Sequence, residues 1–131
     1  MIIDPYTALN GILQTNTAVT SMLGHYIGTT IPLIKGGVLA ETETALPAIT
    51  FYANAGDTDQ VVSNYIFTIN CYAANERDSY LLALKLIEEF NECDSGFDGY
   101  FARTTCNIIT SIPDPQRNEV NTPVSFRIVN I

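Results

Sequence analysis

Apolar residues recur at helical spacing in two stretches near the start of the chain. Asp4-Pro5 is suited to begin a helix, because Asp caps free N–H groups and Pro is tolerated at the first helical position. The stripe that follows consists of Ala8, Leu9, Ile12 and Leu13. A second start at Asn16 leads a stripe of Ala18, Val19, Met22 and Leu23. Gly24 is predicted to close it in a left-handed conformation, which gives two short helices or one bent helix.

The middle of the chain carries strand patterns separated by turn residues. Residues 27–34 form a β-branched run in which Pro32 indicates an edge or a break, and Lys35-Gly36-Gly37 predicts a turn. Residues 38–46 lack a clear period and predict a loop. Pro47 leads a strand over 48–52, and the polar segment 54–59 predicts a hairpin turn.

The clearest alternation lies in residues 65–72. One face holds Tyr65, Phe67, Ile69 and Cys71. The other face is mixed, with Ile66, Thr68, Asn70 and Tyr72. A core-like face beside a mixed face is typical of an antiparallel sheet that is covered mainly on one side.

The strongest helix is predicted over residues 75–92, with Asn75 or Asp78 as its cap. Its apolar stripe consists of Tyr80, Ala83, Leu84, Ile87 and Phe90, widened by Leu82 and Leu86. Two strands follow. In the first, one face holds Ala102, Cys106, Ile108 and Ile112, and Pro113-Asp114-Pro115 predicts the turn after it. The last strand covers 124–131, with Val124, Phe126 and Ile128 toward the core.

The order of elements is therefore helices, three strands, a helix and two strands. Short connections favour a mostly antiparallel sheet of about five strands, with the long helix packed on one face and the short N-terminal helices beside it. This is a two-layer α+β fold. We expect residues 1–131 to form a single domain.

The amino-acid composition excludes several classes of protein and function, whereas it adds little about the fold. Apolar residues make up 47% of the chain and charged residues only 15%, which excludes an intrinsically disordered protein. The net charge of −8 argues against nucleic-acid affinity, which depends on clustered Lys and Arg. No apolar run approaches the length of a membrane-spanning helix.

Candidate chemistry is sparse. Cys71, Cys93 and Cys106 form no Cys-x-x-Cys pair, so we interpret them as buried free thiols of a reducing compartment. His25 has no nucleophile motif beside it, and Gly36-Gly37 precedes no predicted helix that would bind phosphate. We therefore predict no catalytic residue, no cofactor and no metal.

Carboxylates leave one alternative open. Asp57 and Asp59 lie two residues apart and could clamp a divalent cation, and Asp94 and Asp98 resemble the start of a calcium loop without its terminal Glu. A small acidic enzyme or metal-binding domain therefore remains a competing hypothesis. An acidic mimic of DNA is a weaker one, because the fourteen carboxylates are spread along the whole chain.

The surplus of apolar and aromatic residues indicates an assembly subunit, since a small domain exposes much of its surface. The alternation of the last strand sets Arg127, Val129 and Ile131 opposite the core positions. We predict that this strand is fixed within the sheet and that these residues lie near a subunit boundary. The alternative is that its outer face is covered within the same subunit, since strand alternation does not separate the two. Glu41, Glu43, Asp57 and Asp59 lie in predicted loops. We predict that these four acidic residues line a lumen or contact a tube.

Five segments together resemble the tail-terminator and tail-completion family of long-tailed phages. The run Val19-Thr20-Ser21-Met22-Leu23-Gly24-His25-Tyr26-Ile27 is similar to the V-x-x-L-x-G-x-x-I opening of that family. Leu46-Pro47-Ala48-Ile49-Thr50-Phe51-Tyr52 resembles its Pro-led second strand. The strand 66–72, the helix 79–90 and the C-terminal strand pair follow in the same order.

This resemblance implies a non-enzymatic part of a virion, located in the tail or neck and assembled in the cytoplasm of a bacterial host. Such proteins form a ring, usually hexameric, at the head-proximal end of the tail. The implied partners are copies of the chain, the tail tube protein and a neck or head-completion protein. An acidic wall would let genome DNA pass through the lumen without binding it, because like charges repel. Another ring-forming head–tail connector or stopper subunit is the nearest alternative.

Overall fold

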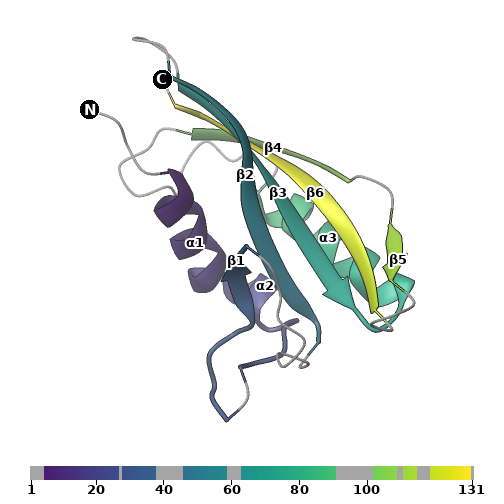
Figure 1. The fold of residues 1–131 in the computed structure, drawn as a ribbon. Coiled ribbons are helices and arrows are strands. Elements are labelled where there is room, and N and C mark those ends of the chain that lie inside the picture. The colour runs from purple at the N-terminus through teal and green to yellow at the C-terminus, as the bar shows by residue number, and fades with distance from the viewer. Residues whose placement is uncertain are drawn as a thin grey trace.

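The protein has an α+β fold in which helices pack on one side of a mixed sheet (Figure 1). The computed structural model describes residues 5–26, 28–37, 46–58, 63–90, 102–108, 111–114 and 119–130. Its helices are α1 (Pro5–Thr15), α2 (Thr17–Thr20) and α3 (Glu76–Phe90). Its strands are β1 (Ile34–Gly36), β2 (Ala48–Thr58), β3 (Ser63–Ala73), β4 (Ala102–Ile108), β5 (Ile112–Asp114) and β6 (Glu119–Asn130). Within these ranges, no helix is long and apolar enough to cross a membrane.

The strand order places the last strand in the middle of the sheet. The order is β1-β2-β3-β6-β4, and β5 pairs with β6 farther along that strand. Every pairing is antiparallel except the parallel pairing of β1 with β2. The predicted mostly antiparallel sheet is confirmed, with six strands in the described ranges instead of about five.

The β2–β3 hairpin is longer than predicted. The expected turn over residues 54–59 is wrong, because β2 continues to Thr58, which pairs with Ser63 of β3. The register shifts between Ala53 and Ala55, so Asn54 is the extra residue of a bulge. A bulge adds one residue to one strand of a pair and increases the local twist. Asp57 therefore lies in a strand, opposite Asn64.

The first predicted strand is largely wrong. Among the described residues 28–34, only Ile34 is in a strand, and Lys35 and Gly36 extend β1 instead of forming a turn. Pro32 forms an isolated bridge to His25, which confirms the predicted break at this proline.

Gly24 is not the left-handed cap that the sequence predicted. Positive φ angles occur at Gly28 (78°) and Gly37 (99°) among the described glycines. The N–H of Gly24 donates to the carbonyl of Pro47 at 2.8 Å, and its carbonyl accepts from the N–H of Leu33 at 2.8 Å. Gly24 thus joins the loop after α2 to the start of β2.

The start of α2 is as predicted. The side-chain oxygen of Asn16 accepts a hydrogen bond from the backbone N–H of Val19 at 3.0 Å, which is a typical N-cap. The helix itself ends at Thr20. The two short N-terminal helices are therefore confirmed.

Helix α3 is capped by Asn75, whose Oδ1 accepts from the N–H of Asp78 at 2.8 Å. The predicted apolar stripe is confirmed at Leu82, Ala83, Leu86 and Phe90, which are buried, and Ile87 is partly buried against the core. It is wrong at Tyr80 and Leu84, which are exposed, so the buried side is rotated toward Leu82 and Leu86. The buried positions are Ser79, Leu82, Ala83, Leu86 and Phe90. The hydroxyl of Ser79 donates to the carbonyl of Cys71 at 2.7 Å and lies 2.7 Å from the hydroxyl of Thr122 on β6. These hydrogen bonds turn Ser79 toward the sheet and so set the rotation of the helix.

The region after α3 forms two strands where one was predicted. β4 ends at Ile108, opposite Val124, whereas Ile112 belongs to β5 and lies opposite Asn121. Ile112 is exposed, so it does not share a buried face with the other apolar positions of that run. Pro113 and Asp114 were predicted as a turn but pair with β6.

β6 begins at Glu119, before its predicted start at Val124, and includes Pro123. Proline is normally excluded from the middle of a sheet because it lacks an N–H. The pairing with β4 stops at Val124 and the pairing with β5 starts at Asn121. Pro123 therefore lies between the segment of β6 that pairs with β4 and the segment that pairs with β5, where no described strand pairs with that edge of β6.

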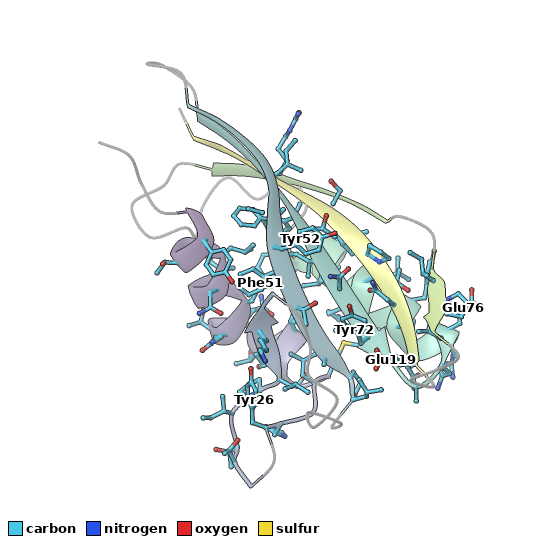
Figure 2. The ribbon with its side chains drawn as sticks, in the orientation of Figure 1. Tyr26, Phe51, Tyr52, Tyr72, Glu76 and Glu119 are labelled. Atoms are coloured by element: carbon cyan, nitrogen blue, oxygen red, sulfur yellow. The ribbon has the colours of Figure 1, made fainter. Side chains whose placement is uncertain are left out.

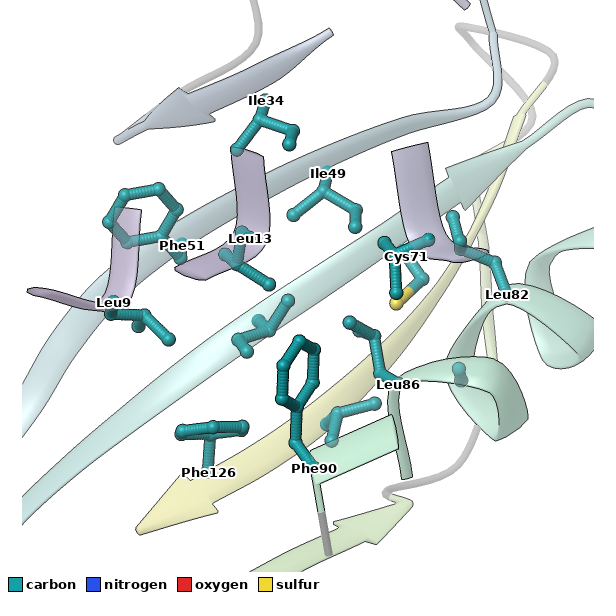
Figure 3. Close-up of a cluster of buried hydrophobic side chains, with 14 of the residues drawn as sticks. Leu9, Leu13, Ile34, Ile49, Phe51, Cys71, Leu82, Leu86, Phe90 and Phe126 are labelled. Carbon is teal, nitrogen blue, oxygen red and sulfur yellow. The ribbon is translucent and has the colours of Figure 1, made fainter. Parts of the chain in front are cut away.

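The core lies between the helices and one face of the sheet (Figure 3). The helices contribute Leu9, Leu13, Val19, Leu82, Leu86 and Phe90. The sheet contributes Ile49, Phe51, Phe67, Ile69, Cys71, Val124 and Phe126. The rings of Phe90 and Phe126 meet edge to face at 5.9 Å between centroids, an arrangement that aromatic pairs prefer. The predicted core positions of the 65–72 and 124–131 strands are thus confirmed wherever their side chains are described.

Candidate functional site

The sheet has a second face that no described helix covers. We call it the open face. Along each strand its residues alternate with the core residues, and the register places them side by side: Tyr52, Ile66, Thr68, Asn70, Tyr72, Ile112, Asn121, Ser125 and Arg127. Figure 2 looks onto this face, with Tyr52 and Tyr72 over the strands and α3 behind them.

A ladder of amides joins three strands on the open face. Asn70 of β3 donates to the hydroxyl of Thr50 on β2 at 3.2 Å. Asn121 of β6 donates to Oδ1 of Asn70 at 2.9 Å and accepts from the backbone N–H of Cys71 at 3.1 Å. Thr50 and Asn70 are buried. Buried polar groups that are satisfied in this way hold a surface in one arrangement before any partner binds.

The exposed part of the open face is amphipathic. Tyr52 is 46% exposed and lies in one register row with Thr68 and Ser125. Ile66 lies opposite Arg127, whose side chain is exposed. Tyr72 packs beside the small cluster of Leu33 and Ala48 at the other end of the face. Tyr and Arg are both residue types that are enriched in protein interfaces.

A second exposed apolar surface lies on α3, on the side turned away from the core. We call it the α3 outer face. Tyr80, Leu81 and Leu84 are 44%, 41% and 39% exposed. Beside them, Nζ of Lys85 lies 3.2 Å from a carboxylate oxygen of Glu88.

A shallow hollow of about 310 Å³ lies at the start of the same helix. It is lined by Glu76, Arg77 and Tyr80. The α3 outer face is therefore not flat at this end, and its rim carries both signs of charge.

Asp57, Arg127 and Val129 come together at one end of the sheet. Asp57 lies opposite Asn64, and Asn64 lies opposite Val129. Arg127 is two residues away from Val129 along β6. The prediction that the last strand is fixed within the sheet is confirmed, since β6 pairs with β3 on one side and with β4 on the other. Glu41, Glu43, Asp59 and Ile131 lie outside the described residues.

The nucleophilic side chains of the described residues serve the packing. Cys71 is fully buried, and burial raises the pKa of its thiol far above the ordinary value, so the thiol stays protonated and unreactive. Thr122 lies within 2.7 Å of the Ser79 hydroxyl and 2.9 Å of the Ser111 hydroxyl. These hydrogen bonds connect α3 with the sheet. Cys71 is thus a buried free thiol as predicted, and the side chains of Cys93 and Cys106 lie outside the described set.

No metal centre is found in the part of the chain that the structure describes. Those residues include no group of three or more His, Cys, Asp or Glu that could hold an ion. His25 is exposed on the loop after α2. Asp59, Asp94 and Asp98 lie outside the described ranges. Of the four carboxylates in the metal-binding hypothesis, the structure describes the backbone of Asp57 alone.

Sequence reasoning missed Tyr52, Tyr80 and Leu84 as surface residues. The first lies at the end of a predicted strand, and the other two lie on a predicted buried stripe. The predicted stripe included Leu82, Leu86 and Phe90 as well as Tyr80 and Leu84, and periodicity alone does not fix where the buried side is centred. The structure centres it on Leu82, Leu86 and Phe90, on the side that also holds buried Ser79.

Comparison with known proteins shows a shared fold. No known protein family matches the sequence, and no curated protein matches it. Among solved structures, a chain described as "Virion of native gene transfer agent (GTA) particle" is similar, with a TM-score of 0.63 at 12% identity. The match covers 95% of this chain and 92% of the other. The two chains therefore share the fold over nearly their whole lengths.

Proposed function

We propose that this chain is a structural subunit of a phage-like virion, and that it forms a ring at the head-proximal end of a tail. The observation that carries the proposal is the fold shared, over nearly the full length of both chains, with a component of a gene transfer agent particle. The order of segments supports the same family, because it resembles tail-terminator proteins from the first helix to the last strand.

The surface supports an assembly role. Two separate surfaces of one small subunit carry exposed apolar side chains: Tyr52 and Ile112 on the open face, and Tyr80, Leu81 and Leu84 on the α3 outer face. Large exposed apolar patches on a small domain mark interaction sites. A ring needs two different surfaces on each subunit, because neighbours in a cycle meet head to tail.

In this role the ring ends the polymerisation of the tail tube and joins the tail to the neck. Its partners are further copies of the chain, the tail tube protein and a neck or head-completion protein. The net charge of −8 fits a lumen through which DNA passes without being retained. The activity is mechanical, and the proposal assigns no catalytic residue, cofactor or metal.

The test is to add the purified chain to a polymerising tail tube protein from the same virus-like element. We expect a ring in native mass spectrometry, at about 86 kDa if six subunits of 14.4 kDa close a cycle. We also expect shorter tubes that carry one ring at one end in negative-stain images. Heat-denatured chain serves as the control.

Two results separate the alternatives. A ring that does not bind the tube but binds the head-completion protein would assign the chain to the neck, as a connector or stopper. A chain that stays monomeric at high concentration and also on the tube would contradict the ring altogether.

A further inference from the structure

We propose that the two outer strands of the sheet pair with each other between copies of this chain, so that β2 of one subunit lies beside β4 of the next. The inference rests on the proposed function, because it requires the chain to assemble with itself. It goes beyond that function by assigning the strands that meet, their relative direction and the charged positions that select the partner.

Two strand edges are unpaired among the described residues. β1 pairs with β2 from Ile49 to Phe51, and no described strand lies beside Tyr52–Thr58, which we call the β2 edge (Figure 1). β4 pairs with β6 on one side, and no described strand lies on its other side, which we call the β4 edge. An unpaired edge presents backbone N–H and C=O groups to which another strand can bind.

The two edges lie at the same end of the sheet and run in opposite directions. Thr58 and Ala102 share a register row, through Ser63 and Asn130. Each pairing from β2 through β3 and β6 to β4 is antiparallel, so β4 is antiparallel to β2. A second copy added in the same orientation therefore presents its β2 antiparallel to β4, and the alternation of the sheet continues. This contact joins two different edges head to tail, as a ring requires.

Each edge carries one charged residue, and the two signs are opposite. Asp57 is the charged residue of the β2 edge, and Arg103 is the charged residue of β4. They occupy one register row, in which Asp57 is opposite Asn64, Asn64 is opposite Val129, and Val129 is opposite Arg103. Pairing of the two edges without stagger therefore makes Asp57 of one copy the cross-strand neighbour of Arg103 of the next. Opposite charges at such positions stabilise a strand pair, and like charges destabilise it.

The other charged positions on this side of the sheet do not cancel the match. Arg127 lies two residues from Val129 along β6, so the strands on the β4 side stay positive. Lys35, opposite Thr50, lies toward the other end of the sheet, as do Asp114 and Glu119, which are opposite each other. The charges therefore favour pairing of a β2 edge with a β4 edge over pairing of either edge with its own kind.

Two charge reversals in the full chain test the pairing. Asp57→Arg makes both edges positive, and Arg103→Glu makes both negative. Glu76→Arg is the matched control, because it changes the net charge by the same amount as Asp57→Arg. Glu76 is exposed at the start of α3, beside β5 and away from both edges (Figure 2). Circular dichroism and thermal melting establish that each variant is folded.

We expect each reversal to weaken the contact between copies about tenfold, because a cross-strand attraction becomes a repulsion. Native mass spectrometry over a dilution series measures this, and the wild type and Glu76→Arg should keep the ring at equal concentrations. The double variant Asp57→Arg/Arg103→Glu should form the ring again, because every contact then joins opposite charges in exchanged positions. Sodium chloride at about 1 M should reduce the differences, since exposed charges are screened.

Neutral variants replace a reversal that fails to fold. Asp57→Thr and Arg103→Thr should each weaken the contact about threefold, because the attraction is lost without a repulsion. Their double variant should be no weaker than either single one, since both substitutions remove the same pair.

The outcomes distinguish the two proposals. If the wild type is monomeric, alone and on the tube, the proposed function fails. If the wild type forms a ring and the folded reversals assemble as tightly as it does, the pairing of these edges is wrong while the ring stands. A loss in only one of the two reversals would show an edge that meets its own kind. A double variant that does not recover would show that the two positions are not neighbours. Either result overturns the pairing.

Discussion

Asn121 shows how a single side chain can hold a surface in place. Its amide lies between β3 and β6, accepts from the backbone N–H of Cys71 at 3.1 Å and donates to Asn70 at 2.9 Å. Asn70 in turn donates to Thr50 on β2. Asn121 thus links β6 to β3, and through Asn70 it is connected to β2.

Asn121→Ala should lower the free energy of unfolding by about 1–3 kcal/mol, because it leaves the N–H of Cys71 and the Oδ1 of Asn70 without that partner. Gln14→Ala is the control. The Gln14 amide donates to Asn10 on an exposed turn of α1, and its loss should cost less than about 0.5 kcal/mol. Urea unfolding followed by circular dichroism measures both values. Equal losses in the two variants would contradict the role assigned to Asn121.

Cys71 makes stability depend on pH in a defined direction. Burial raises the pKa of its thiol in the folded state above the ordinary value of about 9, so folding favours the protonated thiol. This contribution is fully present below about pH 9. Above that pH the unfolded chain releases the proton and the folded chain does not, so stability falls by about 1.4 kcal/mol per pH unit.

Cys71→Ala isolates this effect from the titration of other groups. At pH 7 the variant should be less stable than the wild type, because the substitution leaves a small cavity. The deficit should shrink by about 2 kcal/mol when the pH is raised to about 10.5, since the variant has no thiol to titrate. Urea unfolding of both proteins at the two pH values gives the difference. A deficit that is independent of pH would show that the thiol titrates equally in both states.

At the scale of elements, the rotation of α3 about its own axis decides which of its apolar residues are buried. The helix was predicted over residues 75–92 with Asn75 or Asp78 as its cap, and α3 covers Glu76–Phe90 with Asn75 as its cap. Its buried side differs from the predicted one because the Ser79 hydroxyl bonds to the carbonyl of Cys71 and lies 2.7 Å from the Thr122 hydroxyl. This rotation buries Leu86 and exposes Leu84 on the α3 outer face.

Two Leu→Ala variants on the same helix check the rotation. Leu86→Ala should destabilise the fold by about 2–5 kcal/mol, the range for buried leucines that leave a cavity. Leu84→Ala should cost less than about 1 kcal/mol in the isolated subunit, since its side chain is partly in water. Thermal or urea unfolding at a concentration that keeps both variants monomeric measures the pair. The reverse order of the two losses would contradict the observed rotation of α3.

At the scale of the whole molecule, the arrangement of the layers and the net charge both bear on which partners the protein can bind. The helices cover one face of the sheet, the opposite face is open, and the chain as a whole carries a charge of −8. The register places Arg103 and Arg127 at one end of the sheet, together with Asp57. The net negative charge of the chain disfavours contacts with nucleic acid, whose phosphates require clustered cations.

The assembled protein should not retain double-stranded DNA. At about 0.15 M salt, proteins that bind DNA through its phosphates have dissociation constants of about 1–100 µM, and we expect this chain to bind more weakly than that. Gel retardation of a DNA fragment by the wild-type assembly measures it, with polylysine as the positive control. A retarded band that disappears steeply with added salt would show a basic lumen instead of an acidic one.

The local pattern of the sequence determined the type of most elements. Alternation over 65–72 and 124–131 predicted β3, the later part of β6 and their core faces, because the side chains of a strand point to opposite sides in turn. Asn16 and Asn75 predicted helix starts, because a cap depends only on the following three residues. The strong periodicity of 75–92 predicted α3, and the element order predicted a helix layer on a mostly antiparallel sheet.

Tertiary structure decided what depends on distant partners. The β2–β3 hairpin continues through Asp57 because β3 pairs with it, and the position of β6 between β3 and β4 follows from long-range pairing that no local pattern contains. The rotation of α3 depends on Thr122, 43 residues after Ser79. The long-range strand pairing and the rotation of α3 together leave the open face and the α3 outer face uncovered by the described helices and strands. Periodicity shows that a segment has an apolar side, but only the packing of distant segments decides which apolar side is covered.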